Sequence, residues 1–387
     1  MTRKLLLSAG SVLFVLFLIE LPALIGRLDY RAVIGPMRAL GASLAPDPEL
    51  IKLHRPHAHA TGRFLGSFIQ FKYQIPPSDM TWYRWDAKYD NHGFRNLSDL
   101  KSADIAVIGD SFVEGFTLPD AQLVTSELAS LQGEEVANLG HSDYGPKEEL
   151  VVLRRYGLPL RPRTVVWMFF EGNDLTDVMR YDTVMNDPPS PWRTFVERSF
   201  TKNALQGAER FLFPPAKRPG VQRLGIMRTP GGEFRVYFEP HLPESTLLQP
   251  NFLGAIQETA NTVAAAQELC ASHGIRLVFV FIPEKFRVFR SSCAFPAGSE
   301  CSTWAVNDVP ERLQKAVGAA SPTTEYLDLT SALIDGVKRG ELPYYRDDAH
   351  WTEAGHRIAA EAIHDYLIST QNQSLAAKSN EGADRGR

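Results

Sequence analysis

The chain has 387 residues, of which 44% are hydrophobic and 22% charged, and its formal net charge at pH 7 is −4. This length suits one large domain or two smaller ones with a buried core, and the composition is that of an ordinary globular protein. Nucleic-acid binders need clustered Lys and Arg against phosphates, so the acidic balance argues against that class. The sequence contains no G-x-x-x-x-G-K-[ST] phosphate loop and no Cys/His spacing typical of a zinc site.

An apolar segment opens the chain. Two basic residues precede an uncharged run at 5–19, and apolar residues resume after Glu20 as far as Ile25. About 20 apolar residues cross a bilayer as a helix, and a carboxylate costs less near the interface than at the bilayer centre. The pattern favours an uncleaved membrane helix within residues 1–27. A cleaved signal peptide and a buried helix are the alternatives.

The same segment predicts where the rest of the chain lies. Basic residues before an apolar run stay on the cytoplasmic side, so everything after Arg27 is expected outside the membrane. In a bacterial cell this means a single-pass protein of the inner membrane with a periplasmic domain. Cys293 and Cys301 enclose a short loop that a disulfide could close in such an oxidising compartment, whereas Cys270 stands in a helical pattern and is expected to be a buried thiol.

Residues 28–80 show no clear repeat, and their Pro and His content indicates a connector that packs onto the main domain. The main domain is expected at 81–370. It contains five short apolar or β-branched runs, at 105–108, 136–139, 164–170, 276–282 and 325–329. Near-continuous apolar strands of this kind belong to sheets that are covered on both faces.

Helical patterns separate these strands, at 122–131, 147–156 and 252–272, and a further one at 355–368 closes the domain. The alternation predicts right-handed crossovers and a parallel sheet between two helical layers, an α/β/α sandwich. The functional crevice is then expected beyond the carboxyl ends of the strands. Two segments depart from the alternation. The proline-rich residues 181–250 form an insertion, and the polar residues 371–387 are expected to be a disordered tail.

The first strand of the sheet runs into Gly109-Asp110-Ser111, after which a helical pattern begins. Ser-x-x-Glu at 111–114 is a capping-box pattern, in which Ser111 and Glu114 satisfy N–H groups of the helix. The other interpretation is a nucleophile on a tight strand-to-helix turn, where backbone N–H groups face a developing oxyanion. The motif alone leaves both interpretations open.

A serine nucleophile needs a base, and the base needs an orienting group. The stretch Asp347-Asp348-Ala349-His350 offers both, although a polar loop with a solvated histidine is the alternative. The spacing allows Asp347 to hold one ring nitrogen of His350 while the other accepts the serine proton. Asp348 is expected to point elsewhere, as a surface carboxylate, and His356 to be structural.

An oxyanion needs hydrogen-bond donors, and two candidates follow predicted strands. Gly140 follows the second strand and could present a backbone N–H, and Asn173 follows the third and could offer its side-chain amide. Each of them alone is more often a turn or cap residue. Their joint placement after successive strands, together with Ser111 and His350, favours a catalytic arrangement.

These positions resemble, in their order along the chain, the SGNH (GDSL-like) hydrolases over roughly residues 104–368. The matching elements are Gly109-Asp110-Ser111, Gly140, Gly172-Asn173-Asp174, and Asp347 with His350. Residues 91–95 and 350–356 look like the membrane-anchored bacterial branch of that family. One position departs from the pattern, because Glu171 stands where the family usually has a glycine.

The resemblance implies a fold and a set of roles. The fold is the three-layer, flavodoxin-like SGNH hydrolase sandwich. The resemblance makes Ser111 the nucleophile, His350 the general base and Asp347 its orienter. It makes the backbone N–H groups of Ser111 and Gly140 and the side chain of Asn173 the oxyanion donors. It implies no metal and no organic cofactor.

The expected activity is serine ester hydrolysis through an acyl-serine intermediate. Resemblance and predicted location suggest acylated carbohydrate or cell-envelope esters as substrates. The same triad could instead transfer acyl groups to a polysaccharide, as in the similar alginate O-acetyltransferases. A catalytically silent scaffold or carbohydrate-binding subunit of an export complex is the non-enzymatic alternative, and envelope polysaccharide machinery is a candidate partner. Trp192 and Tyr237, in the insertion, could stack on sugars or belong to the core.

Overall fold

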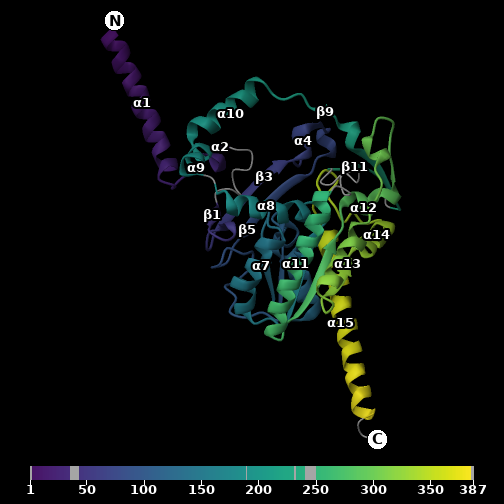
Figure 1. Cartoon of the computed structure of the whole chain (residues 1–387). Coiled ribbons are helices and arrows are strands. Elements are labelled where there is room, and N and C mark those ends of the chain that lie inside the picture. The colour runs from purple at the N-terminus through teal and green to yellow at the C-terminus, as the bar shows by residue number, and fades with distance from the viewer. Residues whose placement is uncertain (1, 35–42, 189, 231, 240–249, 385–387) are drawn as a thin grey trace.

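The computed structural model describes residues 2–34, 43–188, 190–230, 232–239 and 250–384. A layered domain forms the body of the molecule, and a long helix projects from it near each end of the chain, α1 (Thr2–Leu24) and α15 (Glu353–Asp384) (Figure 1).

Five parallel strands form the central sheet, in the order β14-β12-β8-β6-β7. Their bounds agree with the five predicted runs to within one residue: β6 (Ile105–Gly109), β7 (Val136–Gly140), β8 (Thr164–Phe170), β12 (Arg276–Ile282) and β14 (Glu325–Asp328). Numbered along the chain, the strands lie in the flavodoxin-like order 2-1-3-4-5, which confirms the predicted α/β class with a parallel sheet. The order reverses between β6 and β8, and ligands bind at such a switch point.

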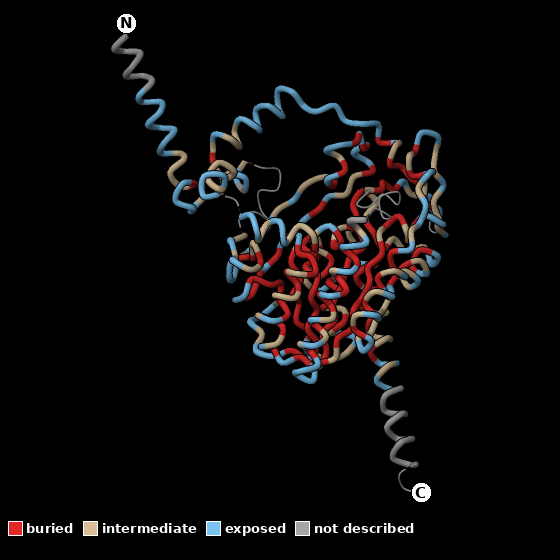
Figure 2. Tube along the Cα trace, viewed as in Figure 1, coloured by how far each residue is buried: buried red, intermediate tan, exposed pale blue. Residues whose placement is uncertain are grey.

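Side chains of each strand alternate between two hydrophobic cores. In β8, Val165, Trp167 and Phe169 face one core, and Val166, Met168 and Phe170 face the other. Helices that pack on the first core are α7 (Pro146–Val152), α8 (Asp174–Asn186), α11 (Pro250–Ser272) and α13 (Val309–Ala320). The second core lies under α6 (Val124–Gln132), α12 (Lys285–Phe289), α14 (Thr330–Lys338) and α15. Figure 2 shows the buried layer between them.

The C-terminal segment departs from its prediction. α15 continues to Asp384, so residues 371–384 are helical and not the disordered tail that was expected. Half of these 14 residues are Leu, Ala, Gln or Lys, which favour helices, and no proline interrupts the stretch.

Residues 43–88 build small β-structures against the sandwich. β1 (Leu44–Asp47) pairs with β2 (Ile51–His54), and β3 (His59–Leu65) pairs with β5 (Trp82–Lys88), all antiparallel. The boundary expected between residues 80 and 81 therefore falls between two paired strands. Leu50 and Leu53 belong to the first hydrophobic core, so this part of the chain is continuous with the main domain.

The insertion at 181–250 divides into two parts. α9 (Pro191–Arg198) and α10 (Phe200–Leu212) lie beside α1 and α2 (Tyr30–Ile34), away from the sheet (Figure 1). The chain then returns through β9 (Arg218–Pro219), which pairs with β4 (Tyr73–Gln74). The second part is a small antiparallel sheet of β10 (Leu224–Thr229), β11 (Gly232–Tyr237) and β13 (Cys293–Ala294).

One side-chain prediction fails, one alternative that the sequence left open is decided, and one prediction is confirmed. The expected disulfide is absent, because Cys293 and Cys301 are free thiols; the Cys301 Sγ lies 3.8 Å from the carbonyl oxygen of Gln222. Tyr237 is fully buried, and its hydroxyl donates to Asp79 at 2.7 Å, so it belongs to the core and cannot stack on a sugar. Cys270 is a buried thiol, as predicted.

The N-terminal apolar run forms the helix α1. Over the residues that the structure describes, no helix combines the length and the apolar composition needed to cross a bilayer.

Candidate active site

Ser111 is the first residue of a short helix, α5 (Ser111–Glu114), directly after β6. The cap of this helix is Asp110, whose carboxylate accepts the Phe112 N–H at 2.9 Å. The capping-box interpretation of 111–114 is therefore wrong. The Ser111 Oγ is left for another partner, and it lies 2.8 Å from Nε2 of His350.

Two glycines let the nucleophile turn pack against the neighbouring strand ends. A Cβ on Gly140 would lie 2.5 Å from the backbone nitrogen of Glu114, and one on Gly109 would lie 2.9 Å from the carbonyl oxygen of Met168. Real Cβ atoms do not approach this closely, so only glycine fits at either position. The two glycines are register partners at the ends of β6 and β7.

Asp348, and not Asp347, holds the histidine. The Asp348 Oδ1 lies 2.5 Å from Nδ1 of His350 and accepts the His350 backbone N–H at 2.7 Å. Asp348 is also buried rather than a surface carboxylate. Because aspartate readily accepts hydrogen bonds from the backbone two residues on, the i, i+2 spacing suits this contact.

Asp347 points to a different part of the chain. Its carboxylate accepts hydrogen bonds from the Thr81 N–H (3.0 Å), the Thr81 hydroxyl (2.7 Å) and the Tyr83 hydroxyl (2.9 Å). Asp347 therefore fastens the histidine loop to the start of β5, and its predicted pairing with His350 is not formed.

The electrostatics of the pair favour a charged imidazole. Burial lowers the pKa of His350, but the carboxylate of Asp348 outweighs burial and raises this pKa to about 9. In the same pair, burial raises and the imidazole lowers the pKa of Asp348, which ends far below its usual range. Asp348 thus stays an anion. Its carboxylate can stabilise the positive charge that His350 acquires when it accepts the proton of Ser111.

A buried lysine supports the histidine loop. Four backbone carbonyl oxygens lie 2.6–3.0 Å from Nζ of Lys285, those of Tyr237, Tyr345, Arg346 and Asp348. Burial lowers the pKa of Lys285 to about 8. Nothing in the sequence singled this lysine out, apart from its place just after a predicted strand.

The predicted oxyanion donors have protein partners. The Gly140 N–H donates to the Asn138 side chain at 3.0 Å, and the Asn173 amide donates to Asp177 at 2.6 Å. A side-chain amide carries two hydrogens, so Asn173 has a second N–H to offer. The structure places both residues at the carboxyl ends of strands next to β6, and their role as oxyanion donors stays a prediction.

Glu171, at the position where a glycine was expected, has a structural function. Its buried carboxylate accepts the Glu284 N–H at 2.9 Å and accepts hydrogen bonds from two guanidinium nitrogens of Arg287, Nε and Nη2. Glu171 therefore ties the end of β8 to α12.

Glu114 organises the back of the site. This fully buried carboxylate accepts hydrogen bonds from the Tyr89 hydroxyl (2.7 Å) and from the backbone and hydroxyl of Ser142 (2.6 and 2.5 Å), and its Oε1 lies 3.1 Å from Nε2 of His54. Burial raises the pKa of Glu114, but the His54 contact and the other hydrogen bonds lower it far below its usual range. Glu114 thus links the nucleophile helix to the loop after Gly140.

His356 is structural, as predicted. It is buried, and its Nδ1 accepts the Val124 N–H at 3.0 Å, which satisfies a donor at the start of α6. Burial lowers the pKa of His356 to about 3, so it stays neutral.

Comparison with the models of known protein families gives one match. The family model described as ALGX, SGNH hydrolase-like domain, acetyltransferase AlgX, matches residues 242–384. The matched region contains Lys285, Asp348 and His350, and Ser111 lies before it. No curated protein matches the chain.

Solved structures of low similarity also match. A putative lipolytic protein of the G-D-S-L family from Desulfitobacterium hafniense is 12% identical, with 67% of this chain and 97% of that one covered and a TM-score of 0.36. A GDSL-like lipase from Bacteroides thetaiotaomicron is also 12% identical (69% and 88% covered, TM-score 0.34). A mutant acetyl-xylooligosaccharide esterase from Geobacillus is 11% identical (68% and 93% covered, TM-score 0.35). TM-scores below 0.5 support no conclusion, so the likeness to the SGNH hydrolase-like family rests on the family model, which matches residues 242–384 of this chain.

Proposed function

We propose that this protein is a serine ester hydrolase that works through an acyl-serine intermediate. The contact that carries the proposal is the Ser111 Oγ at 2.8 Å from Nε2 of His350, whose Nδ1 is held by Asp348. Ser111 and His350 are only partly buried, so a substrate can reach them. Nucleophile, base and orienter in this sequence of contacts are what acyl transfer to serine requires.

The chemistry follows from the contacts. Ser111 Oγ attacks the ester carbonyl carbon while its proton moves to Nε2 of His350, and Asp348 stabilises the resulting imidazolium. Collapse of the tetrahedral intermediate breaks the bond to the alcohol, which takes the proton from Nε2. A water molecule then attacks the acyl-serine, again with His350 as base, and releases the carboxylic acid. Gly140 and Asn173 lie after strands next to β6, where they can face the oxyanion.

We propose an acylated carbohydrate or another cell-envelope ester as the substrate. We also propose that α1 anchors the chain in the inner membrane and that the catalytic domain lies in the periplasm. The support for this location is the sequence, in which two basic residues precede the apolar run.

O-acyl transfer to a polysaccharide is the second candidate. The description of the matching family model as an acetyltransferase favours it. Hydrolysis and transfer share every step up to the acyl-serine and differ in whether water or a sugar hydroxyl attacks next. A transferase would work with envelope polysaccharide machinery, which supplies the acceptor.

The test is to incubate the full chain with a chromogenic acetyl ester, with and without an acetyl-free oligosaccharide. We expect free acetate in both reactions and no activity in Ser111→Ala, whereas the exposed Ser331→Ala should behave as the unmodified protein. Acetylated oligosaccharide formed at the expense of acetate would replace hydrolysis by transfer. A folded, unmodified chain that neither turns over esters nor reacts with a fluorophosphonate would overturn both.

A further inference from the structure

A helical arm stands apart from the catalytic sandwich. We define it as residues 191–218, which comprise α9, α10, the segment that leads to β9 and the first residue of β9. It lies beside α1 and α2, and its trace is mostly exposed (Figures 1 and 2). Neither α9 nor α10 contains a buried residue. Packing against the sandwich therefore does not explain why α9 and α10 carry large apolar side chains.

Large apolar side chains project from this arm into solvent. Trp192 is 69% exposed and Leu205 is 66% exposed. At the end of α10, three consecutive residues are exposed by 84%, 65% and 76%, namely Phe211, Leu212 and Phe213. Soluble proteins rarely present such a cluster unless something covers it.

The charges of the arm indicate what covers it. Residues 191–218 contain six basic residues and two acidic ones. In α10, apolar positions 200, 204, 205, 208, 211 and 212 share one side of the helix, and Lys202, Gln206 and Arg210 lie on the other. Trp, Phe and Leu on one face with Lys and Arg on the other are typical of helices that lie in the interface of an anionic bilayer.

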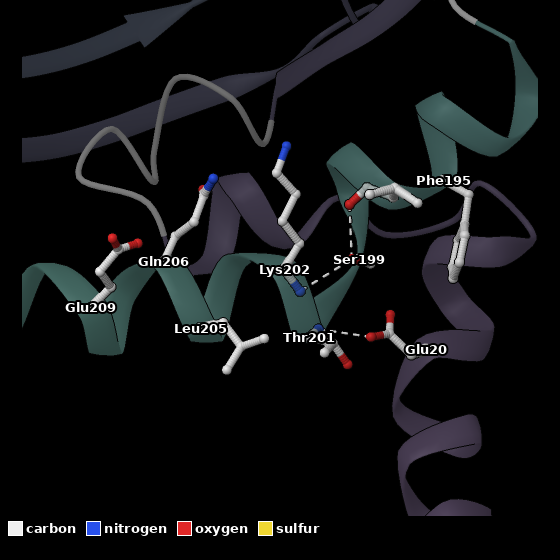
Figure 3. Close-up of a pocket in the computed structure, with 9 residues that line it drawn as sticks. Glu20, Phe195, Ser199, Thr201, Lys202, Leu205, Gln206 and Glu209 are labelled. Atoms are coloured by element: carbon white, nitrogen blue, oxygen red, sulfur yellow. Dashed lines mark hydrogen bonds between the residues drawn. The ribbon is translucent and has the colours of Figure 1, made fainter.

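The arm is joined to the exposed apolar part of α1. The carboxylate of Glu20 in α1 accepts the backbone N–H groups of the first two residues of α10, Phe200 at 2.9 Å and Thr201 at 2.7 Å. Figure 3 shows the contact with Thr201. The ring of Tyr30 packs edge-on against Phe200, with centroids 5.4 Å apart. Glu20 thus satisfies two of the free donors at a helix start, and in return the positive end of the helix dipole stabilises its negative charge.

The exposed apolar residues of α1 and those of the helical arm therefore form one continuous surface. All seven side chains at positions 12–18 of α1 are apolar and exposed. An open cavity of about 770 Å³ lies between α1, α9 and α10, and its wall includes Phe195, Val196 and Leu205 (Figure 3). A surface that is apolar on α1 and amphipathic on α10 matches a bilayer, which is apolar inside and charged at its surface.

We propose that the helical arm is a lipid-binding surface that lies on an anionic bilayer, with its apolar residues among the acyl chains and its basic residues at the headgroups. α1 enters the same bilayer beside it. The arm would hold the catalytic sandwich close to the membrane surface. This proposal rests on the proposed insertion of α1 in the membrane and not on the esterase proposal, because the arm contributes no residue to the Ser111 site.

The experiment uses the full chain reconstituted into vesicles of phosphatidylglycerol and phosphatidylcholine. An environment-sensitive fluorophore is attached to Phe211→Cys or, as the matched control, to Leu97→Cys, since both side chains are 84% exposed. Cys270 and Cys301 are buried, and burial raises the pKa of Cys293 to about 12, so the unmodified chain serves as a low-labelling blank.

We expect a lipid-borne quencher to reduce the fluorescence at position 211, and aqueous iodide to quench it several-fold less than at position 97. In vesicles of phosphatidylcholine alone, the difference in iodide quenching between positions 211 and 97 should be smaller. The double variant Arg210→Glu with Lys217→Glu should reduce this difference in both kinds of vesicle. Equal iodide quenching at the two positions would overturn the proposal. Protection of position 211 from both quenchers would assign the arm to a protein partner or a second copy of the chain, and would overturn it as well. Ester turnover, measured in the same samples, reports separately on the triad.

Discussion

The two neighbouring aspartates give the sharpest test of the site. Asp348→Asn removes the charge beside the imidazole, whereas Asp347→Asn changes a carboxylate that contacts Thr81 and Tyr83. The pair is closely matched, because the two variants differ by one position and introduce the same side chain. Only the first is expected to affect catalysis strongly.

The expected magnitude follows from the pKa of His350. Raising this pKa from 6.5 to about 9 corresponds to about 3 kcal/mol of stabilisation of the imidazolium. Loss of that stabilisation alone would slow the reaction by about 10²–10³, and an amide can also hold the ring in the wrong tautomer. We therefore expect the kcat of Asp348→Asn to fall by about 10³–10⁴. Asp347→Asn should retain kcat to within about tenfold and lose about 1–3 kcal/mol of stability, because an amide N–H replaces one of its acceptors.

The assay is kcat/KM for a chromogenic acetyl ester as a function of pH, together with a thermal melt of each variant. The unmodified protein and Asp347→Asn should share an acid limb near pH 9, where His350 loses its proton. In Asp348→Asn the limb should move to lower pH. If Asp347→Asn were as slow as Asp348→Asn while both remained folded, the assignment of the orienting carboxylate would be wrong.

Three further outcomes are expected. Asn173→Ala should lower kcat by about 10²–10³ in the ester assay and leave the melting temperature nearly unchanged, since its side chain does not cap α8; an unchanged kcat would remove it from the oxyanion donors. Lys285→Met leaves buried carbonyl oxygens unpaired, at about 1–3 kcal/mol per unsatisfied group, so urea unfolding should show a clear loss of stability, and a lower kcat at constant KM would show that the histidine loop has moved. The folded-state pKa of His350 is raised, so its contribution to stability is complete below about pH 6.5 and is lost as the pH rises to about 9; the unfolding free energy should fall over that window and should fall less in His350→Ala.

The sheet could be predicted because its strands carry a local signal. Apolar residues follow one another in β6, β8 and β12, and helical patterns separate the strands, so the order of elements predicts the fold class. The turn at Ser111 was recognisable for the same reason, since it is a short motif directly after a strand.

The orienting carboxylate could not be predicted with the same ease. Asp347 and Asp348 are chemically identical neighbours, and their roles are decided by what each side chain meets. Thr81 lies 266 residues before Asp347 in the sequence, and no local pattern reports that contact. Lys285 is a similar case, because the carbonyl groups that it binds come from β11 and from the histidine loop.

The contacts of Glu114 have a practical consequence for anyone who wishes to express the catalytic part alone. His54 and Tyr89, which lie on either side of the boundary expected from the sequence, both reach this carboxylate behind the nucleophile helix. A soluble fragment that began at residue 81 would keep the triad and lose the His54 contact, so Glu114 would be left buried with its charge less well compensated. A fragment that begins at residue 43 retains the whole network, including the contact of the Ser43 hydroxyl with His54 at 2.7 Å. The start of a useful expression fragment is therefore set by a glutamate that lies seventy residues further along the chain.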